Sequence, residues 1–318
     1  DSCVGCLACT TACPSGVDYG QILEIGRDRL EAVKPNLAKN ILLRSLSNPS
    51  SLRWQLTLSR IFPGRKVPTL LSRLLSGERP EAERPTIQRS DNLPKASPAG
   101  LHSEVYMLEG CAMRVLFPGV HAATRRLLAR LGLAVRETSA GCCGALHAHN
   151  GYLDEARRRA ARLVADMQEA LPVVVNSAGC GATMKQYHEL LGEAPEDRIE
   201  PPVGDEPVQG EGHSLVAHEP KRGFGARVFD LSEFLLAKGL DKLLASSPGV
   251  DLTVAYHDAC HLAHGQQITK EPRALLDSVP GLRVVPLEES DMCCGSAGIY
   301  NLTQPGMARS LLERKWAR

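Results

Sequence analysis

The first fourteen residues contain a cysteine run that constrains the chain more than any other feature. Cys3, Cys6, Cys9 and Cys13 are followed at once by Pro14, which gives the spacing C-x2-C-x2-C-x3-C-P. Runs with this spacing bind an iron–sulfur cubane through their thiolates. The two-residue gaps let one tight loop place three thiolates around a cluster, and the proline stops the loop from continuing as regular structure. A zinc knuckle or disulfides are the alternative interpretation.

In two-cluster proteins the fourth cysteine of such a run ligates a different cluster from the first three. We therefore expect Cys3, Cys6 and Cys9 to hold one [4Fe–4S] cluster and Cys13 to serve another. The three further ligands of that second cluster are not in this sequence. Because residue 1 is aspartate, we expect the sequence to begin inside a longer protein with a matching run upstream.

Length and composition are those of an ordinary globular chain. It has 318 residues, of which 43% are hydrophobic and 23% charged, and this length suffices for about two to three domains. A net charge of +1 gives no support for nucleic acid as a partner. No stretch approaches the length of an uninterrupted apolar membrane span, so we expect no transmembrane segment.

The eleven cysteines are not arranged as a disulfide framework. Their number is odd, and most of those after the first run stand beside glycine or another cysteine. These seven are Cys111, Cys142, Cys143, Cys180, Cys260, Cys293 and Cys294. Grouped thiolates are typical of metal ligands in a reducing compartment. We therefore expect a cytoplasmic protein, either free or peripheral on the inner face of the cell membrane.

The N-terminal part of the chain is expected to be helical, because its apolar residues recur at helical spacing. The predicted helices are Val17–Lys34, Leu37–Leu46, Ser51–Ile61 and Pro68–Leu75. Trp54 and Phe62 are expected to pack between them. A stretch rich in proline and charge at 78–100 predicts a linker. The first domain is accordingly a helical iron–sulfur domain at 1–77, with its N-terminal part missing.

An internal repeat follows the linker. Each copy contains a strand, a lone cysteine, a helix, a second strand, Cys-Cys-Gly and a further helix, and the first copy adds a strand and Cys180. The lone cysteine precedes the cysteine pair by 31 positions in the first copy and by 33 in the second. The elements expected in the first copy are Glu104–Leu108, Val120–Leu131, Leu133–Arg136, Leu153–Ala170 and Pro172–Asn176. Those expected in the second are Leu252–Tyr256, Pro272–Ser278, Leu282–Pro286 and a helix from Gln304 to the end.

This alternation predicts α/β domains with parallel strands, whose ligands lie beyond the carboxyl ends of the strands. The copies occupy 101–192 and 227–318, separated at 193–226 by an exposed insertion rich in proline and glycine. A helical pattern is expected over Arg227–Ala245, with Ser232 as a candidate N-cap. The second copy has no counterpart of Cys180, so its C-terminal part is expected to be missing.

The thiolates of each repeat suit either zinc or a [4Fe–4S] cluster. Two adjacent cysteines strain a single tetrahedral zinc, whereas in a cluster they reach different irons, so we favour iron–sulfur with zinc as the alternative. Nearby histidines serve either as structural hydrogen-bond partners or in proton handling and quinone contact. They are His147, His149, His257, His261 and His264. No phosphate loop or hydrolytic triad appears, so we expect no catalytic residues and an electron-transfer role.

With both repeats and the cysteine run in view, the chain resembles the CCG-domain iron–sulfur family related to heterodisulfide reductase. Within that family it is similar to the iron–sulfur subunits of glycolate oxidase. The segments that carry this similarity are Cys-Cys-Gly-Ala-Leu-His-Ala-His at 142–149, Tyr-His-Asp-Ala-Cys-His-Leu-Ala-His-Gly-Gln at 256–266, and Glu-Ser-Asp-Met-Cys-Cys-Gly-Ser-Ala-Gly-Ile-Tyr-Asn-Leu at 289–302. The resemblance implies a ferredoxin-type helical domain followed by two α/β CCG domains.

The resemblance also implies a function as the non-flavin subunit of an oxidoreductase complex. A partner flavoprotein, which alone carries FAD, oxidises a 2-hydroxy acid such as glycolate, and this chain passes the electrons towards a membrane quinone or a quinone-reducing partner. The four cysteines of the first run are then cubane ligands, and the seven later cysteines are ligands of the CCG clusters. The iron–sulfur subunit of a lactate or glycerol-3-phosphate dehydrogenase, and a zinc-bearing scaffold, are alternatives.

A third alternative is a heterodisulfide-reductase-like subunit with a catalytic CCG cluster. Some relatives close the motif with C-x2-C, whereas this chain has Cys180 alone, with Ser177 and Thr183 three residues to either side. The departure favours a four-thiolate site, or zinc, over a five-thiolate noncubane cluster.

Overall fold

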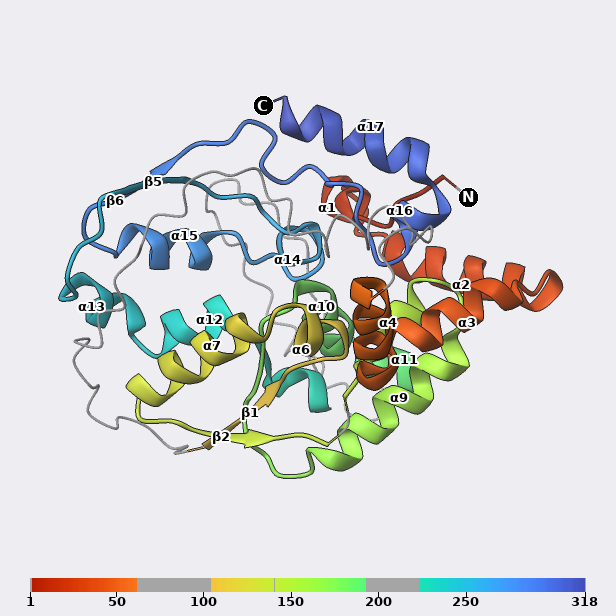
Figure 1. The fold of residues 1–318 in the computed structure, drawn as a ribbon, viewed down its shortest axis with the longest axis horizontal. Helices are drawn as coiled ribbons and strands as arrows, with labels where there is room; N and C mark the ends of the chain where they lie inside the picture. Colours follow the sequence, from red (N-terminus) through yellow and green to blue (C-terminus); the bar gives the residue numbers. More distant parts are fainter. Residues whose placement is uncertain (1, 62–103, 140, 193–222, 318) are drawn as a thin grey trace, which may run out of the picture.

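The computed structural model describes residues 2–61, 104–139, 141–192 and 223–317 (Figure 1). The expected helix Pro68–Leu75, Phe62, the linker at 78–100 and most of the insertion at 193–226 lie outside these ranges.

Four helices form the N-terminal part of the described chain, namely α1 (Ala8–Ala12), α2 (Tyr19–Val33), α3 (Leu37–Leu46) and α4 (Pro49–Ile61). The side chain of Asp18 caps α2 and that of Asn36 caps α3, each by accepting a backbone N–H of the first turn. Leu43 and Leu52 are fully buried, but Trp54 is 69% exposed. The prediction that Trp54 packs between helices is wrong, because two positions after Leu52 it points to the opposite side of α4.

A four-stranded parallel sheet forms the core of the first repeat. Its strands are β1 (Glu104–Leu108), β2 (Ala134–Glu137), β3 (Val173–Val175) and β4 (Val228–Asp230), in the order β2-β1-β3-β4. Every neighbouring pair is parallel, which confirms the predicted pairing. The helices are α6 (Ala112–Leu116), α7 (Pro118–Arg130), α8 (Ala145–Ala148), α9 (Leu153–Asp166), α10 (Ala178–Lys185) and α11 (Tyr187–Leu191).

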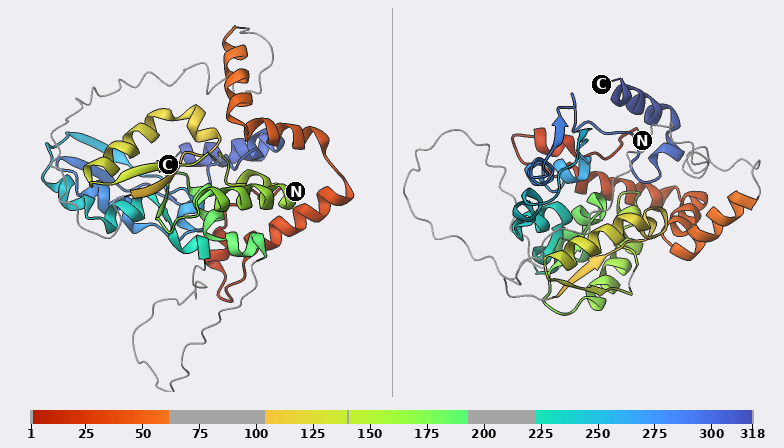
Figure 2. Two further views of the ribbon diagram at one scale, coloured as in Figure 1. Left: turned by 90° about the horizontal axis from the view of Figure 1, so that it is seen from below. Right: turned by 60° about the vertical axis from the view of Figure 1, so that its left-hand side comes forward.

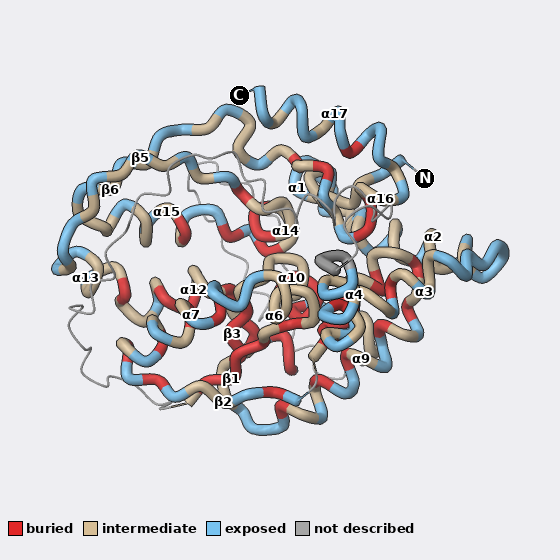
Figure 3. Tube along the Cα trace, in the orientation of Figure 1, coloured by how far each residue is buried: buried red, intermediate tan, exposed pale blue. Residues whose placement is uncertain are grey.

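Both faces of this sheet are buried, as expected where helices cover a parallel sheet on each side. Val173 and Val175 point to one face and pack with Leu163 of α9. Val174 points to the other face and packs with Leu128 of α7 and the helix that follows β4. Figure 3 shows the buried residues concentrated along β1 and β3.

The segment Arg227–Ala245 is not the continuous helix that its pattern predicted. A 3-10 helix (Gly223–Arg227) precedes β4, which is followed by α12 (Leu231–Ala237) and α13 (Leu240–Ala245). Asp230, not Ser232, caps α12, because its carboxylate accepts the Ser232 N–H while Glu233 completes a capping box. β4 falls within 227–318, the range expected for the second repeat, yet it pairs with β3 of the first sheet.

The second repeat has a smaller sheet, in which β5 (Leu252–Ala255) pairs in parallel with β6 (Leu282–Val285). Its helices are α14 (Cys260–Ala263), α15 (Lys270–Asp277), α16 (Tyr300–Thr303) and α17 (Pro305–Trp316). α15 packs against α12 and α13, and α14 packs against α10. The contact between α10 and α14, which contain Cys180 and Cys260, therefore joins the two repeats where these cysteines lie.

The N-terminal segment contacts both repeats, as Figures 1 and 2 show from three sides. The Tyr300 hydroxyl donates to the Ser2 carbonyl at 2.6 Å, while Arg27 donates to the carbonyls of Cys3 and His149. At Gly151, where φ is +80°, a Cβ would lie 2.5 Å from the Arg27 backbone. Only glycine at this position therefore allows α2 to pack so closely against the loop. Among the described residues no helix is both long and apolar enough to cross a membrane.

Candidate metal centres

The four cysteines of the first repeat meet at the carboxyl ends of its strands, where the α/β layout predicts ligands. Cys111 follows β1, Cys142 and Cys143 follow β2, and Cys180 lies in α10 just after β3. Their thiols hydrogen-bond in two pairs, Cys111 to Cys142 and Cys143 to Cys180. Three loops that are distant in sequence thus bring four sulfur atoms together.

The thiols within each pair differ in acidity. A hydrogen bond from Cys111, and then the nearby His147 side chain and the Gly144 N–H, hold the pKa of Cys142 well below its usual range. The pKa of Cys180 is lowered by hydrogen bonds from Cys143 and Ser177. The donors Cys111 and Cys143 have raised pKa values because they give these hydrogen bonds and are buried. Within each pair the acceptor thiol is therefore the more acidic, and the thiolate is the form that binds metal.

Backbone groups hold the Cys-Cys-Gly segment in place. Gly144 has a φ of +87°, and a Cβ there would lie 2.9 Å from the Ala156 carbonyl oxygen of α9. The buried Tyr187 donates its hydroxyl to the Cys143 carbonyl at 2.6 Å. Sequence reasoning missed Tyr187, because it lies in the five-residue helix α11, which is too short to show a periodic pattern.

The second repeat arranges its cysteines in the same way. Cys260 opens α14 after β5, and Cys293 and Cys294 follow β6. Hydrogen bonds from the Cys260 thiol and the Gly295 N–H lower the pKa of Cys293 to about 6. Gly295 has a φ of +78°, and a Cβ there would lie 2.5 Å from the Ala308 carbonyl oxygen. The glycine of each Cys-Cys-Gly thus lets a helix backbone approach the cysteine loop.

The N-terminal cysteine loop lies against this second set. The ring of His261 is hydrogen-bonded to the Gly5 carbonyl at 2.9 Å, and His264 to the Thr11 hydroxyl at 3.2 Å. Cys6 is close enough to Cys293 for their charges to interact, and burial raises the pKa of the Cys6 thiol. The structure therefore places the first run beside the second repeat, although some 250 residues separate them in sequence.

Within the first run, the charges of Cys3 and Cys9 contribute to the raised pKa of Cys6. Cys13 instead accepts hydrogen bonds from backbone groups that follow it, at Ser15 and Val17, which lower its pKa. This arrangement agrees with a separate role for Cys13, and the assignment to two clusters stays a prediction.

The donor chemistry of these sites fits iron–sulfur clusters. The thiols of each repeat are soft donors, with no carboxylate among them, which suits iron–sulfur or zinc and not a hard cation. Among the described residues, no group of three or more His, Cys, Asp or Glu side chains is arranged to hold a metal ion. The four thiols of the first repeat lie as two hydrogen-bonded pairs.

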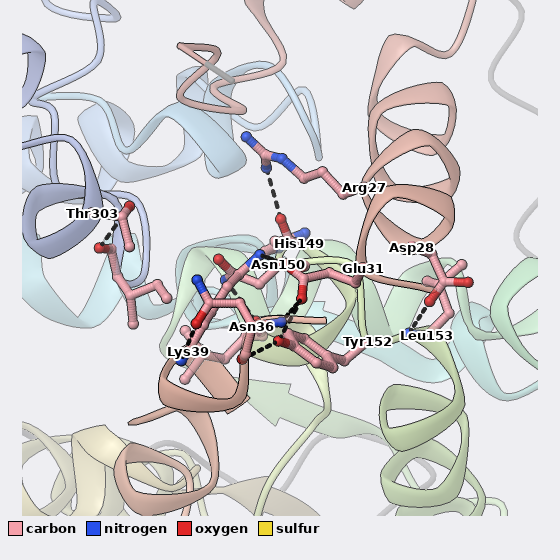
Figure 4. A network of polar contacts seen from close by, with 12 residues as sticks. Arg27, Asp28, Glu31, Asn36, Lys39, His149, Asn150, Tyr152, Leu153 and Thr303 are labelled. Carbon is pink, nitrogen blue, oxygen red and sulfur yellow. Dashed lines mark hydrogen bonds and ion pairs between the residues drawn. The ribbon is translucent and has the colours of Figure 1, made fainter. Parts of the chain in front are cut away.

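A cavity of about 670 Å³ lies where the N-terminal segment meets the two repeats. Cys260, Cys293 and Cys294 line it, together with residues of α2 and α3. Figure 4 shows part of its wall, where Arg27 donates to the His149 carbonyl and Lys39 donates to Glu31 and to the Asn150 carbonyl.

The predicted histidines lie in or near these sites. His147 is fully buried close to Cys142, and His149 pairs with Glu24 at 2.6 Å. His257 and His261 line the cavity. Burial, with the neighbouring His149, lowers the pKa of His261 to about 4, so this ring is neutral.

Comparison with known proteins agrees with this geometry. The family model of the cysteine-rich CCG domain matches residues 105–185 and 254–318, which are the two repeats. The chain is 32% identical to the glycolate oxidase iron-sulfur subunit of Escherichia coli K12 over 99% of its own length and 71% of that protein. It belongs to the family of glycolate oxidase iron–sulfur subunits. This confirms the resemblance seen in the sequence, and both repeats are CCG domains.

Two further relatives are similar to this chain over different lengths. The probable glycolate oxidase iron-sulfur subunit of Bacillus subtilis 168 is 30% identical, again over 99% of this chain and 71% of that protein. A subunit of the fumarate reductase (CoM/CoB) of Methanothermobacter marburgensis is 30% identical, but over only 67% of this chain and 37% of that protein. The glycolate oxidase proteins thus match this chain over a greater length than the fumarate reductase protein does.

Proposed function

We propose that this chain is the electron-transfer iron–sulfur subunit of a flavin-linked 2-hydroxy-acid oxidase, and that glycolate is the acid. A partner flavoprotein carrying FAD oxidises the acid, and this chain passes the electrons towards a membrane quinone. The observation that supports this most is the convergence of the N-terminal cysteine run and the second CCG domain, which is joined to the first through α10 and α14. The similarity over 99% of the chain supports glycolate as the acid.

In this proposal [4Fe–4S] clusters supply the one-electron chemistry. Cys3, Cys6, Cys9 and Cys13 are ligands in the ferredoxin-type helical domain. The CCG ligands are Cys111, Cys142, Cys143, Cys180, Cys260, Cys293 and Cys294. Structural zinc in a CCG domain is the alternative that the same thiols allow.

The protein's own groups hold the ligand loops of the two repeats in place. Tyr187 fixes the carbonyl of Cys143, and the N–H of Gly295 donates to the sulfur of Cys293 at 3.4 Å. Hydrogen bonds to cluster sulfurs and burial are the means by which a protein sets a cluster's potential. The chain needs no catalytic residue for this role, and it works in the cytoplasm, peripheral on the inner face of the membrane.

A heterodisulfide-reductase-like function with a catalytic CCG cluster receives less support. Such a site needs a fifth thiolate, and the position three residues before Cys180 is Ser177, which donates a hydrogen bond to Cys180. Thr183, three residues after Cys180, lines a different cavity beside α2. Four thiolates are what the first repeat offers.

The test is reduction of the clusters by substrate. The chain is purified anaerobically with its flavoprotein partners, and glycolate, lactate or glycerol-3-phosphate is added while the visible absorbance of the clusters is followed. Glycolate is expected to bleach the clusters fastest. If dithionite bleaches them and no 2-hydroxy acid does, the proposal is wrong.

A further inference from the structure

We propose that Lys315 of α17 is a positioning residue for the second CCG centre. Its ammonium group holds the loop before Cys293 and raises the reduction potential of the cluster that this loop helps to bind. The inference rests on the proposed function above, because it requires a redox cluster at the cysteines of the second repeat.

Three backbone carbonyls surround the Lys315 ammonium. Its Nζ donates to the carbonyls of Glu289, Ser290 and Met292 at 3.0, 2.7 and 2.8 Å. All three carbonyls lie within the four residues that directly precede Cys293. A lysine ammonium has three N–H donors, one for each of these carbonyls. The geometry therefore matches the charged form of the side chain and ties α17 to the cysteine loop.

The carbonyls leave the positive charge of Lys315 uncompensated, because a carbonyl group has no net charge. Of the neighbouring carboxylates, those of Glu289 and Asp258 each form an ion pair with an arginine. Asp291 also interacts with the ammonium, but its side chain is 60% exposed, so water screens its charge. Among the described residues, Lys315 itself forms no ion pair.

The charge of Lys315 acts on the cysteines of the second repeat. After the hydrogen bonds from Cys260 and the Gly295 N–H, it contributes to the lowered pKa of Cys293, and it also interacts with Cys294. The charge around a cluster is one of the quantities that set its reduction potential. Because the reduced state carries one more electron, a nearby positive charge stabilises that state and raises the potential.

The first CCG domain has leucine at the equivalent position. The glycine of each Cys-Cys-Gly lies against an alanine of the helix that follows, Ala156 in α9 and Ala308 in α17. Seven residues beyond these alanines stand Leu163 and Lys315. Leu163 is fully buried and packs against β3. A lysine at this position is therefore not required by the CCG fold.

The first centre has a cation of a different kind. Arg159 of α9 is close enough to Cys142 for their charges to interact, but Glu155 pairs with this arginine at 2.8 Å. The carboxylate offsets the positive charge, so we expect Arg159 to affect the first centre less than Lys315 affects the second.

The cysteine loop has a second support that does not involve Lys315. The Asp258 N–H donates to the Ser290 carbonyl at 3.1 Å, and the Ser290 hydroxyl donates to the Asp258 carboxylate at 2.6 Å. Arg273 of α15 donates two hydrogen bonds to the same carboxylate, both at 2.6 Å. Replacing Lys315 is therefore expected to remove a charge while the loop stays attached to the segment that carries Cys260.

The test is a redox titration followed by EPR, on protein purified anaerobically with its clusters. The signal of the second CCG centre is identified as the one that Cys293→Ser removes. Lys315→Met and Lys315→Gln both remove the charge. At the midpoint potential of the unaltered protein, each is expected to lower the ratio of reduced to oxidised centre about tenfold, which is a shift of about 59 mV for one electron.

Two further variants serve as controls. Lys315→Arg keeps the charge, so its midpoint is expected to lie closer to that of the unaltered protein than the midpoints of the neutral variants do. Lys242→Met removes an exposed lysine of α13 and is expected to leave the midpoint unchanged. Iron content is measured on every sample.

A ratio within twofold of the unaltered protein's in both neutral variants overturns the inference. An equal shift in Lys315→Arg also overturns it, because charge is then not the cause. Loss of this centre's iron from both neutral variants would make Lys315 a structural residue, with the same consequence.

Failure of the proposed function gives different results. If Cys293→Ser removes no signal and zinc is found instead of iron, the cluster is absent and the proposed function fails together with the inference. If the midpoint shifts as expected but glycolate reduces no cluster in the presence of the flavoprotein partners, the proposed function alone fails.

Discussion

Replacing the glycine of a Cys-Cys-Gly segment by alanine tests why that motif ends in glycine. At Gly144 the φ of +87° is a conformation that costs an L-residue about 1–2 kcal/mol. The new Cβ would lie 2.9 Å from the Ala156 carbonyl oxygen and 3.2 Å from its Cα, so α9 must shift, at about 1–3 kcal/mol for an overpacked contact. Gly144→Ala is therefore expected to destabilise the protein by about 2–5 kcal/mol.

The assay is urea unfolding followed by circular dichroism, with iron content measured on the same preparations. Gly26→Ala is the control, because Gly26 lies inside α2 and a Cβ there meets no atom within 4 Å. This variant is expected to be more stable than the unaltered protein by about 0.5–1 kcal/mol, since alanine is the better helix former. Equal unfolding midpoints for the two variants would refute the reasoning.

The remaining predictions concern two hydrogen-bonded groups. Tyr187→Phe leaves the buried Cys143 carbonyl without its donor and is expected to lower the free energy of unfolding by about 1–3 kcal/mol, measured by urea unfolding; no change would contradict the assigned bond. Burial alone would raise the pKa of Glu31, but hydrogen bonds from Lys39 and Tyr152 outweigh it and the pKa is lowered. This stabilisation is present above the ordinary carboxyl pKa and is lost as pH falls through the lowered value. The stability deficit of Glu31→Gln at pH 7 is therefore expected to shrink below pH 4, and a constant deficit would contradict this.

Elements with a strong local pattern could be predicted from the sequence. β1 and α3 have the predicted bounds. α3 has apolar residues at helical spacing, and β1 is a short apolar run that ends just before Glu109 and Gly110. The first repeat's cysteines also lie where predicted, since the carboxyl ends of parallel strands meet at one edge of a sheet. A short-range pattern was sufficient in these cases.

Features that depend on contacts distant in sequence could not be predicted. β4 is only three residues long, and its pairing with β3 joins segments on either side of 193–222. Asp230 caps α12 because β4 ends at this residue. The helical spacing of apolar residues does not indicate where β4 ends. The position of the cysteine loop beside His261 and His264 depends on contacts across some 250 residues, for which a single sequence carries no local signal.

The central claim is that the CCG cysteines hold clusters that continue an electron path from the N-terminal run. The most direct measurement is the iron, zinc and acid-labile sulfide content of the protein purified anaerobically in the form in which its cells produce it, with EPR after dithionite reduction. Two ferredoxin-type cubanes account for about eight irons and eight sulfides. The account predicts iron and sulfide well above that level, little zinc, and loss of the excess in Cys142→Ser and Cys293→Ser. About eight of each, with one or two zinc ions, would make the CCG domains structural and contradict it.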